Sequence, residues 1–124
     1  MRLDNRKKKV IAVLSDLMFT VKIQEAAKRA GLDAVFVKSH DDALGQAKQK
    51  PAVIILDLNN TAVDPLDVIE TLKSDQDTRG IDLVGFVSHV QADLKKAALE
   101  KGCDVVIARS AFSQNLPAIL RRYA

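Results

Sequence analysis

One buried strand that ends in a carboxylate constrains the fold of this chain most. Val53, Ile54, Ile55 and Leu56 are consecutive aliphatic residues, and Asp57 follows them directly. A strand with one solvent-exposed face alternates apolar and polar residues, whereas a central parallel strand is apolar on both faces. We therefore expect residues 53–57 to form the central strand of a parallel sheet. Asp57 then lies at the edge where open α/β sheets bind ligands.

Four further apolar runs predict the remaining strands, at residues 10–14, 34–37, 83–87 and 105–108. Apolar residues at helical spacing predict helices over 19–30, from Ser39 to about Gln49, over 65–75 and over 91–101, with a last helix near the C-terminus. Five strands that alternate with five helices indicate a single doubly wound α/β layer structure with a five-stranded parallel sheet and right-handed crossovers.

Several helix ends have recognisable signals. Asp64 followed by Pro65 predicts a helix start, because proline lacks the N–H that would be unpaired in the first turn. Gly31 and Gly102 are placed where helices commonly end.

The last two helices have weaker start signals. Ser88 with Gln91 three residues later resembles a capping box. Ser113 is expected to cap the last helix, which puts Pro117 near the first turn, where proline is tolerated.

Composition limits the possible classes of protein. A chain of 124 residues with 48% hydrophobic residues fits one domain spanning 1–124, with a basic flank at 1–9. No apolar stretch approaches a membrane-spanning length, so we expect a cytoplasmic protein with no membrane partner. The lone Cys103 cannot form an internal disulfide and is expected to be a buried thiol. Net charge is only +3 and aromatic residues are 4%, so a nucleic-acid partner is disfavoured.

Polar residues end four of the predicted strands. They are Ser15 and Asp16, Asp57, Ser88 and His89, and Arg109. Singly, each is ordinary loop chemistry, but parallel strands bring all four ends to one edge, so Asp16 and Asp57 should face each other there. Two carboxylates and a loop carbonyl suit Mg²⁺. A hydroxyl and a guanidinium nearby would bind the oxygens of a phosphoryl group on Asp57.

The chain resembles the receiver domain of response regulators over residues 8–123. This resemblance implies a flavodoxin-like fold with strand order 2-1-3-4-5. It also implies that Asp57 is the phosphoacceptor and that Asp16 is a direct Mg²⁺ ligand. The backbone carbonyl of Asn59 would be a further metal ligand. Ser88 matches the switch hydroxyl, and Arg109 stands where the family has an essential lysine.

Some residues depart from the pattern of that family. Ser15 replaces one acidic residue, which should weaken Mg²⁺ binding. Arg109 is larger than lysine and always charged, so it would either bind a phosphoryl group or hold Asp57 in a permanent ion pair. Further departures are Ser110 in place of a proline, Val106 in place of an aromatic residue, and His89 at a position that is usually small.

The resemblance implies a stand-alone signalling module rather than an enzyme, with at most self-phosphorylation from a donor. Its partners would be a histidine kinase or phosphotransfer protein and a downstream target. The target would dock on the fourth helix, fifth strand and fifth helix. Two modes stay open: phosphorylation on Asp57, or a pseudo-receiver that binds partners without phosphorylation.

Two other classes are disfavoured. Residues 57–61 also resemble the nucleophile motif of haloacid-dehalogenase-type phosphatases. Asn59 would then replace the acid/base aspartate, and 124 residues leave no room for the rest of that fold. A flavodoxin-like flavin carrier would need a Ser/Thr/Gly-rich phosphate cradle after the first strand and more aromatic rings.

Overall fold

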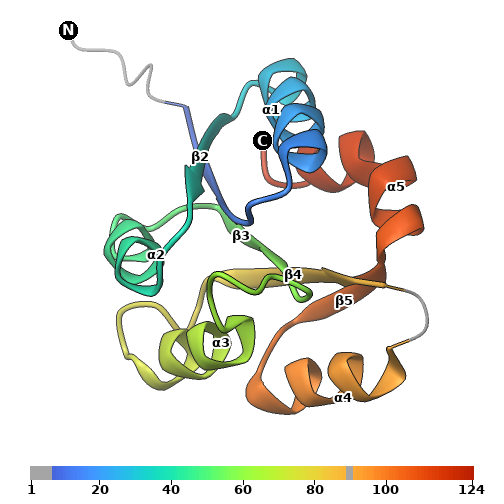
Figure 1. Ribbon diagram of the computed structural model, residues 1–124. Coiled ribbons are helices and arrows are strands. Elements are labelled where there is room, and N and C mark those ends of the chain that lie inside the picture. The colour runs from blue at the N-terminus through green and yellow to red at the C-terminus, as the bar shows by residue number, and fades with distance from the viewer. Residues whose placement is uncertain (1–6, 89–90) are drawn as a thin grey trace, which may run out of the picture.

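The computed structural model describes residues 7–88 and 91–124 and contains a five-stranded parallel sheet. The strands lie in the order β2-β1-β3-β4-β5, which confirms the predicted topology (Figure 1). Their bounds are β1 (Lys9–Val13), β2 (Asp33–Val37), β3 (Val53–Asp57), β4 (Asp82–Val87) and β5 (Val105–Ala108). Lys9, which we expected in the basic flank, opens β1, and its ammonium donates a hydrogen bond of 2.9 Å to Gln49.

Helices cover both faces of the sheet (Figure 1). On one face α1 (Leu17–Ala30) packs beside α5 (Arg109–Arg121). On the other face α3 (Pro65–Ser74) lies between α2 (His40–Ala47) and α4 (Ala92–Lys101). This arrangement confirms the doubly wound layer structure. None of the helices in the described part of the chain has the length and apolar character needed to cross a membrane.

The central strand divides its side chains between two cores. Val53 and Ile55 pack in the core under α1 and α5, while Ile54 and Leu56 pack in the core under α2, α3 and α4. All four side chains are fully buried. Helices cover both faces of β3, and this explains why its sequence does not alternate between apolar and polar residues.

The strongest cap signals are confirmed. Asp64 accepts hydrogen bonds from the N–H groups of Leu66 and Asp67, and Pro65 occupies the first helical position of α3. Gly31 and Gly102 end α1 and α4 with φ angles of 77° and 115°. These left-handed angles favour glycine, which lacks a Cβ atom.

The capping box predicted for the fourth helix and the predicted start of the last helix are wrong, although α4 itself begins at Ala92, directly after its N-cap Gln91. Gln91 precedes α4 without a side-chain capping bond, and only its backbone N–H reaches the Ser88 carbonyl, at 3.1 Å. The last helix starts at Arg109 rather than at Ser113, so Pro117 lies inside α5. Here tertiary packing decides the start, because Phe112 in the first turn of α5 is fully buried. His89, singled out in the sequence, lies outside the described residues.

Candidate functional site

Asp57 stands at the carboxyl end of β3, nearly enclosed by the protein. Its exposed fraction is 6%, and it pairs in register with Phe86 of β4. One carboxylate oxygen, Oδ1, accepts a hydrogen bond of 2.9 Å from the backbone N–H of Asn59. The turn that follows β3 thus fixes the orientation of the carboxylate.

Asp16 reaches the same edge from the end of β1. It is the N-cap of α1, and its Oδ1 accepts a hydrogen bond of 3.2 Å from the Phe19 N–H. The other oxygen, Oδ2, forms an ion pair with Nη2 of Arg109. Asp16 therefore starts the helix with one oxygen and meets the cation of the site with the other. Ser15, the neighbouring residue, is exposed.

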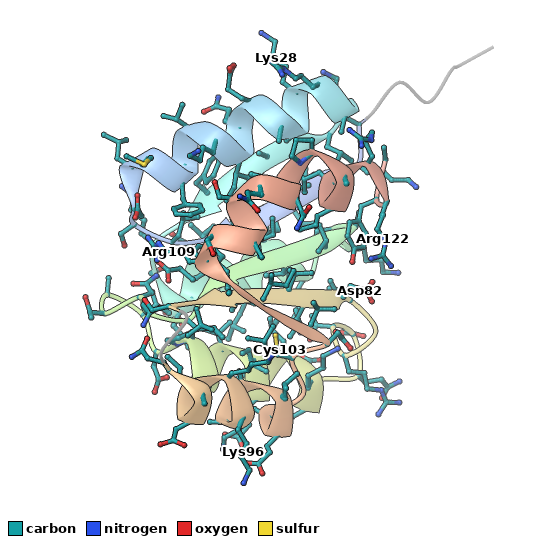
Figure 2. All side chains as sticks on the ribbon, turned by 90° about the vertical axis from the view of Figure 1, so that its right-hand side faces the viewer. Lys28, Asp82, Lys96, Cys103, Arg109 and Arg122 are labelled. Carbon is teal, nitrogen blue, oxygen red and sulfur yellow. The ribbon has the colours of Figure 1, made fainter. Side chains whose placement is uncertain are left out.

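Arg109 is the first residue of α5 and lies where α5 meets β5 (Figure 2). Besides its contact with Asp16, its Nη1 lies 3.8 Å from Oδ1 of Asp57. The guanidinium carbon is 4.6 Å from the centroid of the Phe19 ring and 5.4 Å from that of Phe86. The guanidinium therefore contacts both carboxylates and also lies over two aromatic rings, which attract cations.

Three stacked rings form the platform under Arg109. The Phe86 ring lies 4.9 Å from Phe19 and 4.6 Å from Phe112, measured between centroids. The rings come from α1, β4 and α5, so residues far apart in sequence build one support. Sequence reasoning missed this platform. All four phenylalanines of the chain stand near a strand end or in a first helical turn, so their positions did not single out the three that meet.

Asn59 takes part through its side chain as well as its backbone. Its Oδ1 accepts a hydrogen bond of 2.9 Å from the Ser88 N–H, and its Nδ2 donates to Oε1 of Gln91. The sequence predicted only a backbone carbonyl at this position. The side chain instead ties the turn after β3 to the segment between β4 and α4.

Ser88 lies beside a cavity next to Arg109. The cavity has a volume of about 580 Å³. Its lining combines hydroxyls, two cations and two apolar side chains: Met18, Phe19, Lys22, Ser88, Arg109, Ser110 and Ser113. All the predicted site residues within the described ranges therefore lie at one edge of the sheet.

The environment of Asp57 disfavours its charged form. Burial raises the pKa of its carboxyl above the ordinary value. The hydrogen bond from Asn59 and the charge of Arg109 act in the opposite direction, and the charge of Asp16 adds to the rise. Desolvation is the largest of these effects, so ionising Asp57 costs more in the folded chain than in water.

The contacts of Arg109 leave a poor fit for a divalent metal ion at this edge. Among residues 7–88 and 91–124, no group of three or more His, Cys, Asp or Glu side chains is placed to hold one, but the predicted site has only two carboxylates and would not form such a group. Asp16 and Asp57 are the two carboxylates at this edge, and each presents an oxygen to Arg109. Mg²⁺ would need an oxygen from each of these carboxylates as a ligand. Magnesium binding by this chain stays a prediction, and the contacts of Arg109 argue against it.

Comparisons with known proteins agree on the fold. No family model matches the chain, and no curated protein does. A response regulator from Hahella chejuensis is 22% identical, with 94% of this chain and 95% of that chain covered and a TM-score of 0.83. The phosphorylated cyanobacterial phytochrome response regulator RcpA is 24% identical, with 94% and 91% covered and a TM-score of 0.78.

A third solved structure holds a metal. It is the receiver domain of the sensor histidine kinase PA1611 from Pseudomonas aeruginosa, with a magnesium ion coordinated in its active-site cleft. It is 14% identical, with 95% of this chain and 98% of that chain covered and a TM-score of 0.80. The identities are low, while the coverage is nearly complete in both directions. The chain therefore has the fold of response-regulator receiver domains.

Proposed function

We propose that the chain is a receiver domain of two-component-type signal transduction that passes its signal by docking on other proteins. One observation carries the proposal: Asp16, Asp57, Ser88 and Arg109, which follow four different strands, meet at the ligand-binding edge of a receiver fold. Its partners would be a histidine kinase or phosphotransfer protein and a downstream target. A cytoplasmic location is part of the same proposal.

The docking face that we propose consists of α4, β5 and α5. Leu99 on α4 and Val105 at the start of β5 are exposed apolar side chains on this face, with exposed fractions of 43% and 40%, while the more exposed Leu17, Met18 and Val21 of α1 lie outside it. Large apolar side chains with such exposure gain from burial against a partner. A target that docks there would read the position of α4, whose N-terminal neighbour Gln91 contacts Asn59.

Two modes of signalling are compatible with this role. In one mode Asp57 is phosphorylated, as RcpA is phosphorylated among the similar structures. In the other mode the domain acts as a pseudo-receiver without a phosphoryl group. The contacts of Arg109 with both carboxylates favour the second mode. A phosphatase role is disfavoured, because the neutral Asn59 amide cannot exchange protons as a carboxylate does.

An NMR comparison of the wild type with Asp57→Asn tests the receiver role. The substitution removes one charge without changing the shape of the side chain. We expect amide shifts around Asp16 and Ser88 that extend into α4 and α5. Asp33→Asn is the control, because Asp33 is exposed at the opposite end of the sheet and should give local shifts. Shifts confined to the neighbours of Asp57 would contradict the proposal.

A titration with Mg²⁺ and beryllofluoride separates the two modes, since beryllofluoride stands in for a phosphoryl group on an aspartate. For a pseudo-receiver we expect no site-specific response of the wild type at millimolar Mg²⁺. A response that disappears in Asp57→Asn would establish the phosphorylated mode instead.

A further inference from the structure

We propose that Arg109 is the resident cation of the site: its guanidinium takes the position between Asp16 and Asp57 that a divalent metal would need, so the native chain does not bind Mg²⁺ there. The contacts of Arg109 do not depend on the proposed receiver role. Only the consequence, a signalling site that works without a metal, rests on that role.

Several elements of the fold hold the guanidinium. Arg109 belongs to α5, Asp16 lies between β1 and α1, and Asp57 ends β3. The platform adds Phe19 from α1 and Phe86 from β4. A cation held from four other segments is part of the folded structure, and a metal that bound both carboxylates would have to displace it from Asp16 and Asp57.

The net charge of the site is low for a divalent metal ion. Asp16 and Asp57 contribute −1 each and Arg109 contributes +1, which leaves −1 at the contact. Ser15 supplies no additional carboxylate, and Lys22 lines the adjoining cavity with a second positive charge. Mg²⁺ sites combine carboxylates with other oxygen ligands and several waters. A site with net charge −1 and an internal cation attracts a divalent ion weakly.

The shape of the guanidinium suits its contacts at this site. Its planar fork carries separate N–H groups that face two carboxylates at once, while its flat surface stacks on a ring. In this chain Nη2 faces Asp16, Nη1 faces Asp57, and the carbon between them lies 4.6 Å from the Phe19 centroid. A lysine ammonium is a compact charge and cannot make this set of contacts together. The combination of Arg109 with the phenylalanine platform is therefore specific to an arginine.

Mn²⁺ titration followed by NMR tests the inference, because paramagnetic Mn²⁺ broadens the amide signals near its binding site. We expect no selective broadening around Asp16 and Asp57 in the wild type. Arg109→Ala should gain selective broadening there, with an apparent affinity higher by about 10- to 100-fold, the range by which residues around metal ligands alter metal affinity. The double variant Arg109→Ala with Asp57→Asn should lose this gain.

Arg29→Ala is the matched control, because it removes the same charge from an exposed position of α1. We expect it to leave the Mn²⁺ response of the wild type unchanged. An equal gain in Arg29→Ala would show a general charge effect and would overturn the inference. Equal Mn²⁺ affinity of the wild type and Arg109→Ala would overturn it as well.

Arg109→Lys is the second variant, to be used should Arg109→Ala not fold. It keeps the charge but not the double contact, so we expect selective Mn²⁺ broadening in this variant too. A lysine variant that excludes Mn²⁺ as the wild type does would count against the specific role of the guanidinium. The receiver role is judged separately, because the Asp57→Asn comparison is made without metal.

Discussion

The Lys73 ammonium on α3 lies 2.9 Å from the Asp104 carboxylate, which precedes β5. The same ammonium donates hydrogen bonds of 3.1 Å to the carbonyls of Arg79 and Ile81. Asp104 in turn accepts a hydrogen bond of 2.8 Å from the Leu83 N–H at the start of β4. Lys73 therefore joins the amino-terminal ends of β4 and β5 to α3, at the edge opposite the candidate site.

Gly102→Ala should lower the free energy of unfolding by about 1–3 kcal/mol. Gly102 has a φ angle of 115°, and an added Cβ would lie 2.7 Å from Cγ of Lys73. The substitution therefore strains the backbone and pushes Lys73 away from Asp104. Urea unfolding followed by circular dichroism measures the change.

Gly45→Ala is the control for that substitution. Gly45 lies within α2, and an added Cβ meets nothing within 4 Å. Alanine is favoured over glycine in a helix interior, so we expect a gain of roughly 0.5–1 kcal/mol. A loss of stability in both variants would point to a general sensitivity to alanine instead of the contact with Lys73.

Asp57→Asn should raise the free energy of unfolding at pH 7, by on the order of 1 kcal/mol. Burial raises the pKa of Asp57 in the folded chain above the ordinary value of 3.8. As pH rises from that value to the folded pKa, the unfolded chain releases the proton first, so the wild type loses stability over this interval. Asparagine has no proton to release and avoids the loss.

Urea unfolding at several pH values measures the difference between wild type and Asp57→Asn. The difference should shrink as pH falls below the ordinary carboxyl range, where Asp57 is protonated in both states. A constant difference across pH 3 to pH 7 would show that desolvation of the charge is not its origin.

Cys103 should react with iodoacetamide at pH 8 at least about 100-fold more slowly in the native chain than in the unfolded chain. Burial raises the pKa of this thiol to about 11, and its exposed fraction is 4%. Mass spectrometry of timed samples with and without denaturant gives the ratio. Equal rates would mean that the C-terminal end of α4 opens readily.

Phe19→Leu should change the environment of Arg109 with a stability loss of about 1.5 kcal/mol or less. The substitution removes the ring that lies nearest to the guanidinium. We expect the Arg109 Nε–Hε signal to shift as the ring current disappears. Phe112→Leu is the control, since it alters the same stack at the ring that supports Phe86 from the α5 side. Its effect on the Arg109 signal should be smaller.

Local patterns in the sequence predicted most of the fold. Four apolar runs and the central strand gave the sheet, because burial on both faces removes the polar alternation along a strand. Asp64 predicted a helix start because its side chain accepts hydrogen bonds from nearby backbone N–H groups. Gly102 predicted a helix end because glycine, which lacks a Cβ atom, readily adopts a left-handed backbone angle. The start of α5 could not be predicted in this way, since Ala108 makes no capping bond and the packing of Phe112 decides it.

The candidate site, too, could be predicted only in part. The topology brought Asp16, Asp57, Ser88 and Arg109 to one edge, as their places after the strands predicted. The contact between Arg109 and Asp16 spans 93 positions of sequence. The guanidinium of Arg109 also lies over the rings of Phe19 and Phe86. Local sequence patterns contain no information on such a platform, because its rings meet only after the chain has folded.

The stack of Phe19, Phe86 and Phe112 has a consequence beyond the site itself. It anchors the cation to the hydrophobic core. If Arg109 occupies the pocket as we propose, the state of the pocket is set by folding and not by the supply of an ion. In the pseudo-receiver mode the strength of the signal would then be set by the number of copies of the domain, and control would lie with its synthesis and degradation.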